Sequence, residues 1–167
     1  QAGFAQQTEL IDNYHDDVHA RIFGFEDDSR IIYLISCDNL GLPQIVHDTV
    51  TAELNKTSKK PVSVAISATH THFAPNPRDD RYPAWLAPVL VEACRNLELV
   101  EGNYEIGYQC IPFEEVGKSR ISNHDAEVLL QPIWIVKDGI KVGCLITHNV
   151  HPTILHGTTP YFSAEYP

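Results

Sequence analysis

The chain has 167 residues, of which 43% are hydrophobic and 20% charged. This composition supports a folded domain and excludes disordered, collagen-like and mucin-like chains. The formal net charge of −10 argues against a nucleic-acid partner or an anionic membrane surface, because clustered lysine and arginine bind these. No apolar run approaches the roughly 18 residues that span a bilayer. Nine histidines are present and methionine is absent, which indicates that residue 1 is not a translation start.

The first half of the chain predicts strands alternating with helices. Apolar, β-branched runs predict three strands, over residues 20–25, 30–37 and 62–68. Apolar positions at helical spacing predict two helices, over residues 42–54 and 84–97. The second strand is apolar on both faces, so we expect it to be central. Residues 73–83 are rich in proline, aspartate and arginine and predict a loop.

The second half of the chain predicts further strands. These cover residues 104–111, 128–136 and 140–147. Asp138 and Gly139 lie between the last two runs, and this dipeptide is a strong hairpin signal because a type I′ turn needs positive φ at both central residues. The predicted fold class is therefore α/β, with a mixed β-sheet flanked by helices.

Histidines gather where two predicted strands end. His70 and His72 follow the third strand, and His148 and His151 follow the last. Functional groups collect at such strand ends in α/β proteins. If the strand continues past Ala68, the i, i+2 spacing places His70 and His72 on one face. There they can share a metal such as zinc, or one can bind the metal while the other hydrogen-bonds a substrate. A pair of hydrogen-bonded histidines without a metal explains the same pattern.

Other polar residues can serve this site, and each also has a plainer explanation. His151 precedes Pro152, which fixes the local backbone, and by itself such a histidine is structural. Asp38 ends the central strand and can hold a ligand histidine in position, or it is a turn or helix N-terminal residue. Arg120 lies in a polar stretch and can hold an oxyanion or carboxylate, or it is a solvated loop residue. His148 can share the site or lie on the surface.

The remaining signals exclude several classes of protein. The four cysteines form no CxxC pair, and those in apolar stretches predict buried free thiols: Cys37, Cys94 and Cys144. A serine-hydrolase elbow, a P-loop and a dinucleotide-binding glycine motif are all missing, so nucleotide binding and serine-hydrolase chemistry have no support. Near the N-terminus, Asp16 and Asp17 predict a solvated acidic face.

Three short motifs occur in a fixed order along the chain. Residues 67–72 are SATHTH, residues 149–153 are NVHPT, and residues 162–167 are FSAEYP. Together they resemble the SATHTH, HPT and SADYP segments of neutral/alkaline non-lysosomal ceramidases and their bacterial relatives. Residues 17–21 and 34–42 are similar to an upstream region of the bacterial members. The resemblance implies that residues 1–167 are the N-terminal portion of a single, larger catalytic domain.

The resemblance implies a zinc-dependent amidohydrolase that cleaves the N-acyl linkage of ceramide or a related lipid. In this family the first histidine of THTH and the histidine of HPT bind zinc, which implies His70 and His151 as ligands. The second histidine of THTH assists the tetrahedral intermediate, which implies a catalytic role for His72. An arginine between the motifs also lines the site, and Arg120 is its best match. The implied partner is a small-molecule or lipid amide substrate, while the compartment and the oligomeric state stay unassigned.

The chain also departs from the family pattern. Residues 73–76 are FAPN where the family has SGPG, and Glu165 replaces an aspartate. The family's other zinc ligands, a glutamate and a tyrosine, and its serine nucleophile lie downstream of SADYP. We therefore expect these 167 residues alone to bind zinc weakly with little activity, and any membrane contact to come from other parts of the protein. Two alternatives stay open: a metal-dependent hydrolase of a non-lipid amide or sugar-linked substrate, and a non-catalytic relative.

Overall fold

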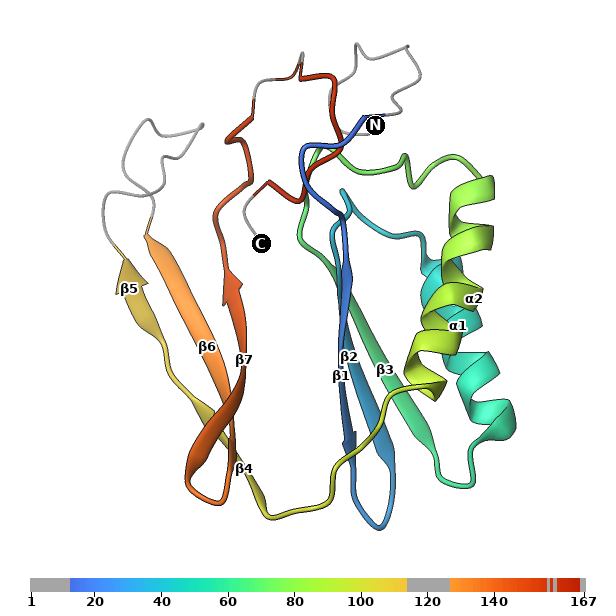
Figure 1. The fold of residues 1–167 in the computed structure, drawn as a ribbon, viewed down its shortest axis with the longest axis vertical. Coiled ribbons are helices and arrows are strands. Elements are labelled where there is room, and N and C mark those ends of the chain that lie inside the picture. Colours follow the sequence, from blue (N-terminus) through green and yellow to red (C-terminus); the bar gives the residue numbers. More distant parts are fainter. Residues whose placement is uncertain (1–12, 114–126, 156, 158, 166–167) are drawn as a thin grey trace. The chain divides into compact units, whose positions relative to one another are not determined.

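The computed structural model of the chain describes residues 13–113, 127–155, 157 and 159–165. Two units are distinguished along the chain. Unit 1 comprises Gln1–Leu99 and Pro152–Pro167, and unit 2 comprises Val100–His151. Figure 1 labels the helices and strands of both units. Within the described ranges, every helix is too short or too polar to cross a membrane.

Unit 1 contains a mixed sheet of three strands: β1 (Ala20–Glu26), β2 (Ile31–Cys37) and β3 (Val62–Ala68). β1 pairs antiparallel with β2, and β2 pairs parallel with β3. The sheet therefore confirms the predicted central place of the second strand. The turn between β1 and β2 is closed by Asp27, whose Oδ1 accepts the N–H groups of Ser29 and Arg30.

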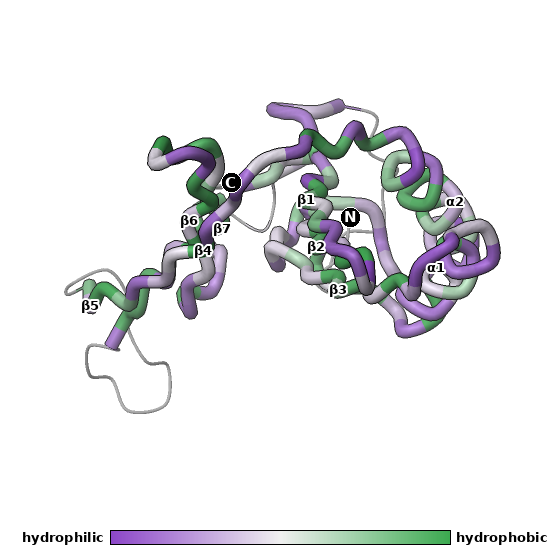
Figure 2. The backbone as a smooth tube through the Cα atoms, turned by 90° about the horizontal axis from the view of Figure 1, so that it is seen from below, coloured by the Kyte–Doolittle hydropathy of each residue, from purple (hydrophilic) through white to green (hydrophobic). Residues whose placement is uncertain are grey.

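Two helices pack on one face of this sheet, as Figures 1 and 2 show. α1 (Gln44–Thr57) connects β2 to β3, and α2 (Arg81–Arg95) follows β3. The core combines alternate residues of β2 with one stripe of each helix: Tyr33, Ile35, Cys37, Val46, Val50, Leu54, Leu86, Leu90 and Cys94. Because β2 and β3 are parallel, the core holds their carboxyl ends at one edge, where residues 38–41 and 69–73 begin.

Two of the core residues are cysteines, as the sequence predicts. Cys37 and Cys94 are buried free thiols. Burial raises the pKa of Cys37 to about 12 and that of Cys94 to about 11. Both thiols therefore stay protonated at neutral pH and act as small apolar side chains. Cys144 is also a free thiol, but it is only half-buried.

The boundaries of α2 differ from the prediction. The helix begins at Arg81, within the segment expected to be a loop, and ends at Arg95 rather than at residue 97. The segment predicted as a loop ended at Pro83, which instead lies in the first turn of the helix. In the first helical turn no N–H has to be donated within the helix, so a proline is tolerated there.

Unit 2 contains an antiparallel sheet of four strands: β4 (Tyr104–Tyr108), β5 (Ile111–Phe113), β6 (Val128–Lys137) and β7 (Ile140–His148). β6 pairs with each of the other three strands. The predicted hairpin joins β6 to β7. Asp138 and Gly139 have φ of 50° and 79°, as a type I′ turn requires.

The single strand predicted over residues 104–111 is divided into β4 and β5. Both pair with β6 in one continuous register. At the interruption, Gln109 donates its N–H to the Pro132 carbonyl at 3.1 Å, but Pro132 has no N–H to return. The gap in the ladder therefore lies opposite a proline of the neighbouring strand.

We expect Gly139→Ala to lower the free energy of unfolding by about 1 kcal/mol. The cause is conformational, since Gly139 has positive φ and an added Cβ would meet nothing within 4 Å. Gly107→Ala in β4 is the control, because its Cβ would make an ordinary contact with the Trp134 Cβ at 3.8 Å. Urea denaturation followed by circular dichroism measures both variants. Equal losses in the two would contradict this explanation.

Candidate metal centre

Residues 69–73, here called the histidine loop, follow β3 and carry His70 and His72. β3 ends at Ala68, where the predicted strand ends, and His70 has a positive φ of 69°, which turns the backbone out of the extended conformation. The same-face arrangement required the strand to continue past Ala68, so it does not apply here. The two rings nevertheless lie together, with centroids 5.4 Å apart and planes inclined by 66°. The His70 side chain is exposed and that of His72 is buried.

His70 is held by the loop that follows β2. Its backbone N–H donates to the Asn39 carbonyl at 2.8 Å, and its Nδ1 lies 2.6 Å from the Leu40 carbonyl oxygen. A carbonyl oxygen only accepts, so this contact places the proton on Nδ1 and the lone pair on Nε2. Metal-binding histidines typically have this arrangement, in which a carbonyl or carboxylate fixes the tautomer and the orientation of the ring.

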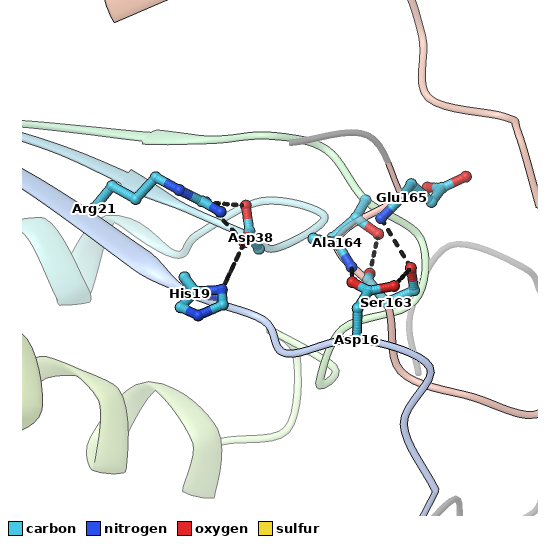
Figure 3. Close-up of polar contacts among 8 residues, drawn as sticks. Asp16, His19, Arg21, Asp38, Ser163, Ala164 and Glu165 are labelled. Carbon is cyan, nitrogen blue, oxygen red and sulfur yellow. Dashed lines mark hydrogen bonds and ion pairs between the residues drawn. The ribbon is translucent and has the colours of Figure 1, made fainter. Parts of the chain in front are cut away.

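Asp38 anchors this loop to β1. Its side chain is 0% exposed, and its carboxylate accepts hydrogen bonds from Arg21 Nη1 at 3.0 and 2.9 Å and from the His19 N–H at 2.9 Å (Figure 3). The carbonyls of the next two residues are the ones that hold His70. Through the backbone, the Asp38 ion pair therefore fixes a loop that positions a predicted ligand.

The buried part of the histidine loop, residues 71–73, contacts residues 160–165, here called the closing segment. The Thr71 hydroxyl donates to the Ser163 carbonyl at 2.8 Å, and the Ser163 N–H donates to the Phe73 carbonyl at 3.0 Å. Thr71, Phe73 and Ala74 have no exposed surface. Phe73 and Ala74, which stand where ceramidases have serine and glycine, are therefore interior residues of unit 1.

Glu165 links the histidine loop to the residues that follow His151. Its Oε2 accepts the His72 N–H at 3.1 Å. Its Oε1 accepts the N–H groups of Ile154 at 3.2 Å and Leu155 at 3.4 Å. Glu165 has a φ of 66°, a conformation that costs a non-glycine residue about 1–2 kcal/mol. The surrounding hydrogen bonds stabilise this strained conformation.

Asp16, near the N-terminus, also holds the closing segment in place (Figure 3). Its Oδ2 accepts the Ser163 hydroxyl at 2.6 Å, and its Oδ1 accepts the Ala164 N–H at 2.7 Å. Partial burial by itself raises the pKa of Asp16, but these two hydrogen bonds and a third from His15 outweigh burial and hold the pKa below its usual 3.8. Asp16 is therefore only partly solvated: its side chain is 41% exposed, and its carboxylate also binds the closing segment.

His151 directly precedes Pro152, at which the chain re-enters unit 1. One ring nitrogen from each of His70, His72 and His151 lies within 4.8 Å of the other two. Three imidazole nitrogens suit a first-row metal such as zinc, and the Nδ1–H of His70 leaves its Nε2 lone pair for such an ion. The donor set therefore fits a metal, and the group includes His72 beside the two predicted ligands.

Two further predicted residues are not tested by this group. Arg120 lies outside the described residues. His148 ends β7 in unit 2, where its Nδ1 accepts the Val150 N–H at 3.3 Å, and its role at the site stays a prediction. Sequence reasoning missed three anchoring residues: Asp16, Thr71 and Ser163. The FSAEYP motif marked the closing segment, but no local pattern indicated which residues it contacts.

The fold and the histidine group define an α/β protein with a candidate metal centre. Among solved structures, the chain is similar to a ceramidase complexed with C2, with a TM-score of 0.83 and 16% identity over 98% of this chain and 30% of that one. It is also similar to the neutral ceramidase from Pseudomonas aeruginosa, with a TM-score of 0.73 and 16% identity over 91% of this chain and 29% of that one. No family model matches, and no curated protein matches.

These comparisons establish the fold. The chain has the fold of part of a neutral ceramidase and spans about 30% of the length of the solved ceramidases. The α/β class predicted from the sequence is confirmed.

We expect acid to weaken the attachment of the closing segment. The folded-state pKa of Asp16 lies below 3.8, so its hydrogen bonds contribute stability above about pH 4, and this is lost as the pH falls through the lowered pKa. Asp16→Asn should reduce the stability near neutral pH by about 1 kcal/mol and flatten its acid dependence. Thermal unfolding near neutral pH and at about pH 3 measures both effects.

The exposed neighbour provides the control for this experiment. Asp17→Asn removes the same charge from an exposed position and should leave the acid dependence unchanged. An equal response of the two variants would show that net charge, rather than the contacts of Asp16, determines the effect.

Proposed function

We propose that the chain supplies the histidine part of the metal centre of a zinc-dependent amidohydrolase similar to neutral ceramidase, acting on the N-acyl linkage of ceramide or a related lipid. One observation carries the proposal: the grouped nitrogens of His70, His72 and His151 lie on a ceramidase-like fold. When bound, zinc would supply an activated water or hydroxyl and polarise the amide carbonyl.

The three histidines have distinct roles in this proposal. His70 would bind zinc through Nε2, because its Nδ1–H donates to a carbonyl. His151 would be the second ligand. His72 is buried beside them and has its backbone N–H fixed by a carboxylate, so its ring is preorganised either to complete the ligand set or to hydrogen-bond the developing oxyanion and relay a proton. Arg120 would add positive charge near the oxyanion.

A second candidate function keeps the metal centre and changes the substrate to a non-lipid amide or a sugar-linked compound. The residues after His72 favour it, because Phe73 and Ala74, which replace the serine and glycine of the ceramidase-like SGPG segment, are both fully buried. A third candidate is a relative that has lost catalysis. The presence of all three histidines supports an enzyme instead.

We expect His70→Ala to lower the zinc affinity and to abolish hydrolysis. Loss of a residue that only hydrogen-bonds a metal ligand lowers metal affinity about 10–100-fold, and loss of the ligand itself should lower it by more. Zinc content measured by inductively coupled plasma mass spectrometry tests the first effect. Hydrolysis of a fluorescent N-acylsphingosine and of a short N-acyl amine tests the second. Both are measured on the full natural protein that contains this chain.

His47→Gln, in α1, is the matched histidine control and should leave zinc content and hydrolysis unchanged. Unchanged zinc content and hydrolysis in His70→Ala would overturn both enzyme proposals. Hydrolysis of the short N-acyl amine, without hydrolysis of the N-acylsphingosine, would select the second candidate. Zinc binding by the unmodified protein without hydrolysis of either substrate would select the third.

A further inference from the structure

We infer that Glu165 is a positioning residue that sets the spacing of the metal-binding histidines, an inference that rests on the proposed function. Its two carboxylate oxygens bond to two different segments. Oε2 accepts from His72 in the histidine loop, and Oε1 accepts from Ile154 and Leu155, which follow His151 closely along the chain. One side chain therefore joins the two segments that carry the proposed ligands.

The backbone of Glu165 is itself fixed by hydrogen bonds. Its N–H donates to the Ser163 hydroxyl oxygen at 3.0 Å, and that hydroxyl donates to Asp16 at 2.6 Å. The Ser163 carbonyl accepts from Thr71 in the histidine loop at 2.8 Å. The position of the Glu165 backbone, and with it that of the carboxylate, is thus tied through Ser163 to both Asp16 and the histidine loop. The left-handed φ of Glu165 persists because these contacts over-determine it.

The chemistry of the contact requires a carboxylate. All three partners of the Glu165 side chain are backbone N–H donors, so each needs an acceptor oxygen. Glutamine has the same shape but only one such oxygen, and its NH₂ group would face an N–H group. Glu165→Gln should therefore release one of the two segments while preserving the volume of the side chain. Glu165 acts only through the segments that it holds.

The first test needs no metal. Amide hydrogen exchange in the metal-free natural protein is compared between wild type and Glu165→Gln at His72, Ile154 and Leu155. We expect faster exchange at these amides in the variant. Glu98→Gln changes an exposed glutamate and should leave their exchange unchanged. Equal exchange in wild type and Glu165→Gln would overturn the inference, whatever the metal does.

The second test measures binding of Co²⁺, a spectroscopic substitute for zinc. We expect the dissociation constant to rise about 10–100-fold in Glu165→Gln, with a changed visible absorption band that a general loss of stability would not produce. Glu165→Asp keeps both acceptor oxygens on a shorter side chain, so its affinity should lie between the two, and it serves if the glutamine variant does not fold.

The outcomes separate this inference from the proposed function. Wild-type Co²⁺ affinity in Glu165→Gln would overturn the positioning role. If the wild type binds neither Co²⁺ nor zinc, the proposed function fails, and the exchange data alone decide whether Glu165 holds the two segments together.

Discussion

Ser163 is the residue at which three distant parts of unit 1 are joined. It is 2% exposed, and its carbonyl, N–H and hydroxyl bond to Thr71, Phe73 and Asp16. A buried polar group without a partner costs about 1–3 kcal/mol. Breaking any one of these three contacts would therefore leave a buried group of Ser163 without a partner. The arrangement is therefore cooperative: the N-terminal segment, the histidine loop and the closing segment are placed together or not at all. The positions of the neighbouring histidines depend on it.

Backbone strain is concentrated at the same place. Apart from the β-hairpin turn, the positive φ values of non-glycine residues in the described chain fall on His70 and Glu165. Neither residue needs this conformation for local folding, since neither closes a tight turn between strands. The described residues of the apolar core between β2 and the helices have none of these positive φ values, and the core holds the strand ends from which the loops begin. A rigid scaffold supporting strained loops is the usual arrangement at functional sites.

The sequence predicted the features that depend on neighbours along the chain. Apolar runs located β1, β2 and β3, and Asp138 with Gly139 located the hairpin, because hydrophobic periodicity and turn chemistry are local. Apart from the boundaries of α2, the differences from the prediction concern contacts between residues far apart in the sequence. Division of β4 from β5 depends on Pro132 in the partner strand, and the role of Asp16 depends on a residue 147 positions away. Spacing along the chain grouped His70 with His72, and their rings do lie together. Loop contacts, and not a continued strand, place His70.

The same sequence separation determines when the centre can form. Ribosomes add about 5–20 residues per second, so the strands and helices of unit 1 emerge several seconds before the closing segment does. Until then the Thr71 hydroxyl lacks its partner 92 positions later, and the His72 N–H lacks the Glu165 carboxylate 93 positions later. A nascent chain that ends before the closing segment thus lacks these two contacts of the histidine loop. These contacts of the histidine loop therefore form only after the closing segment has been synthesised.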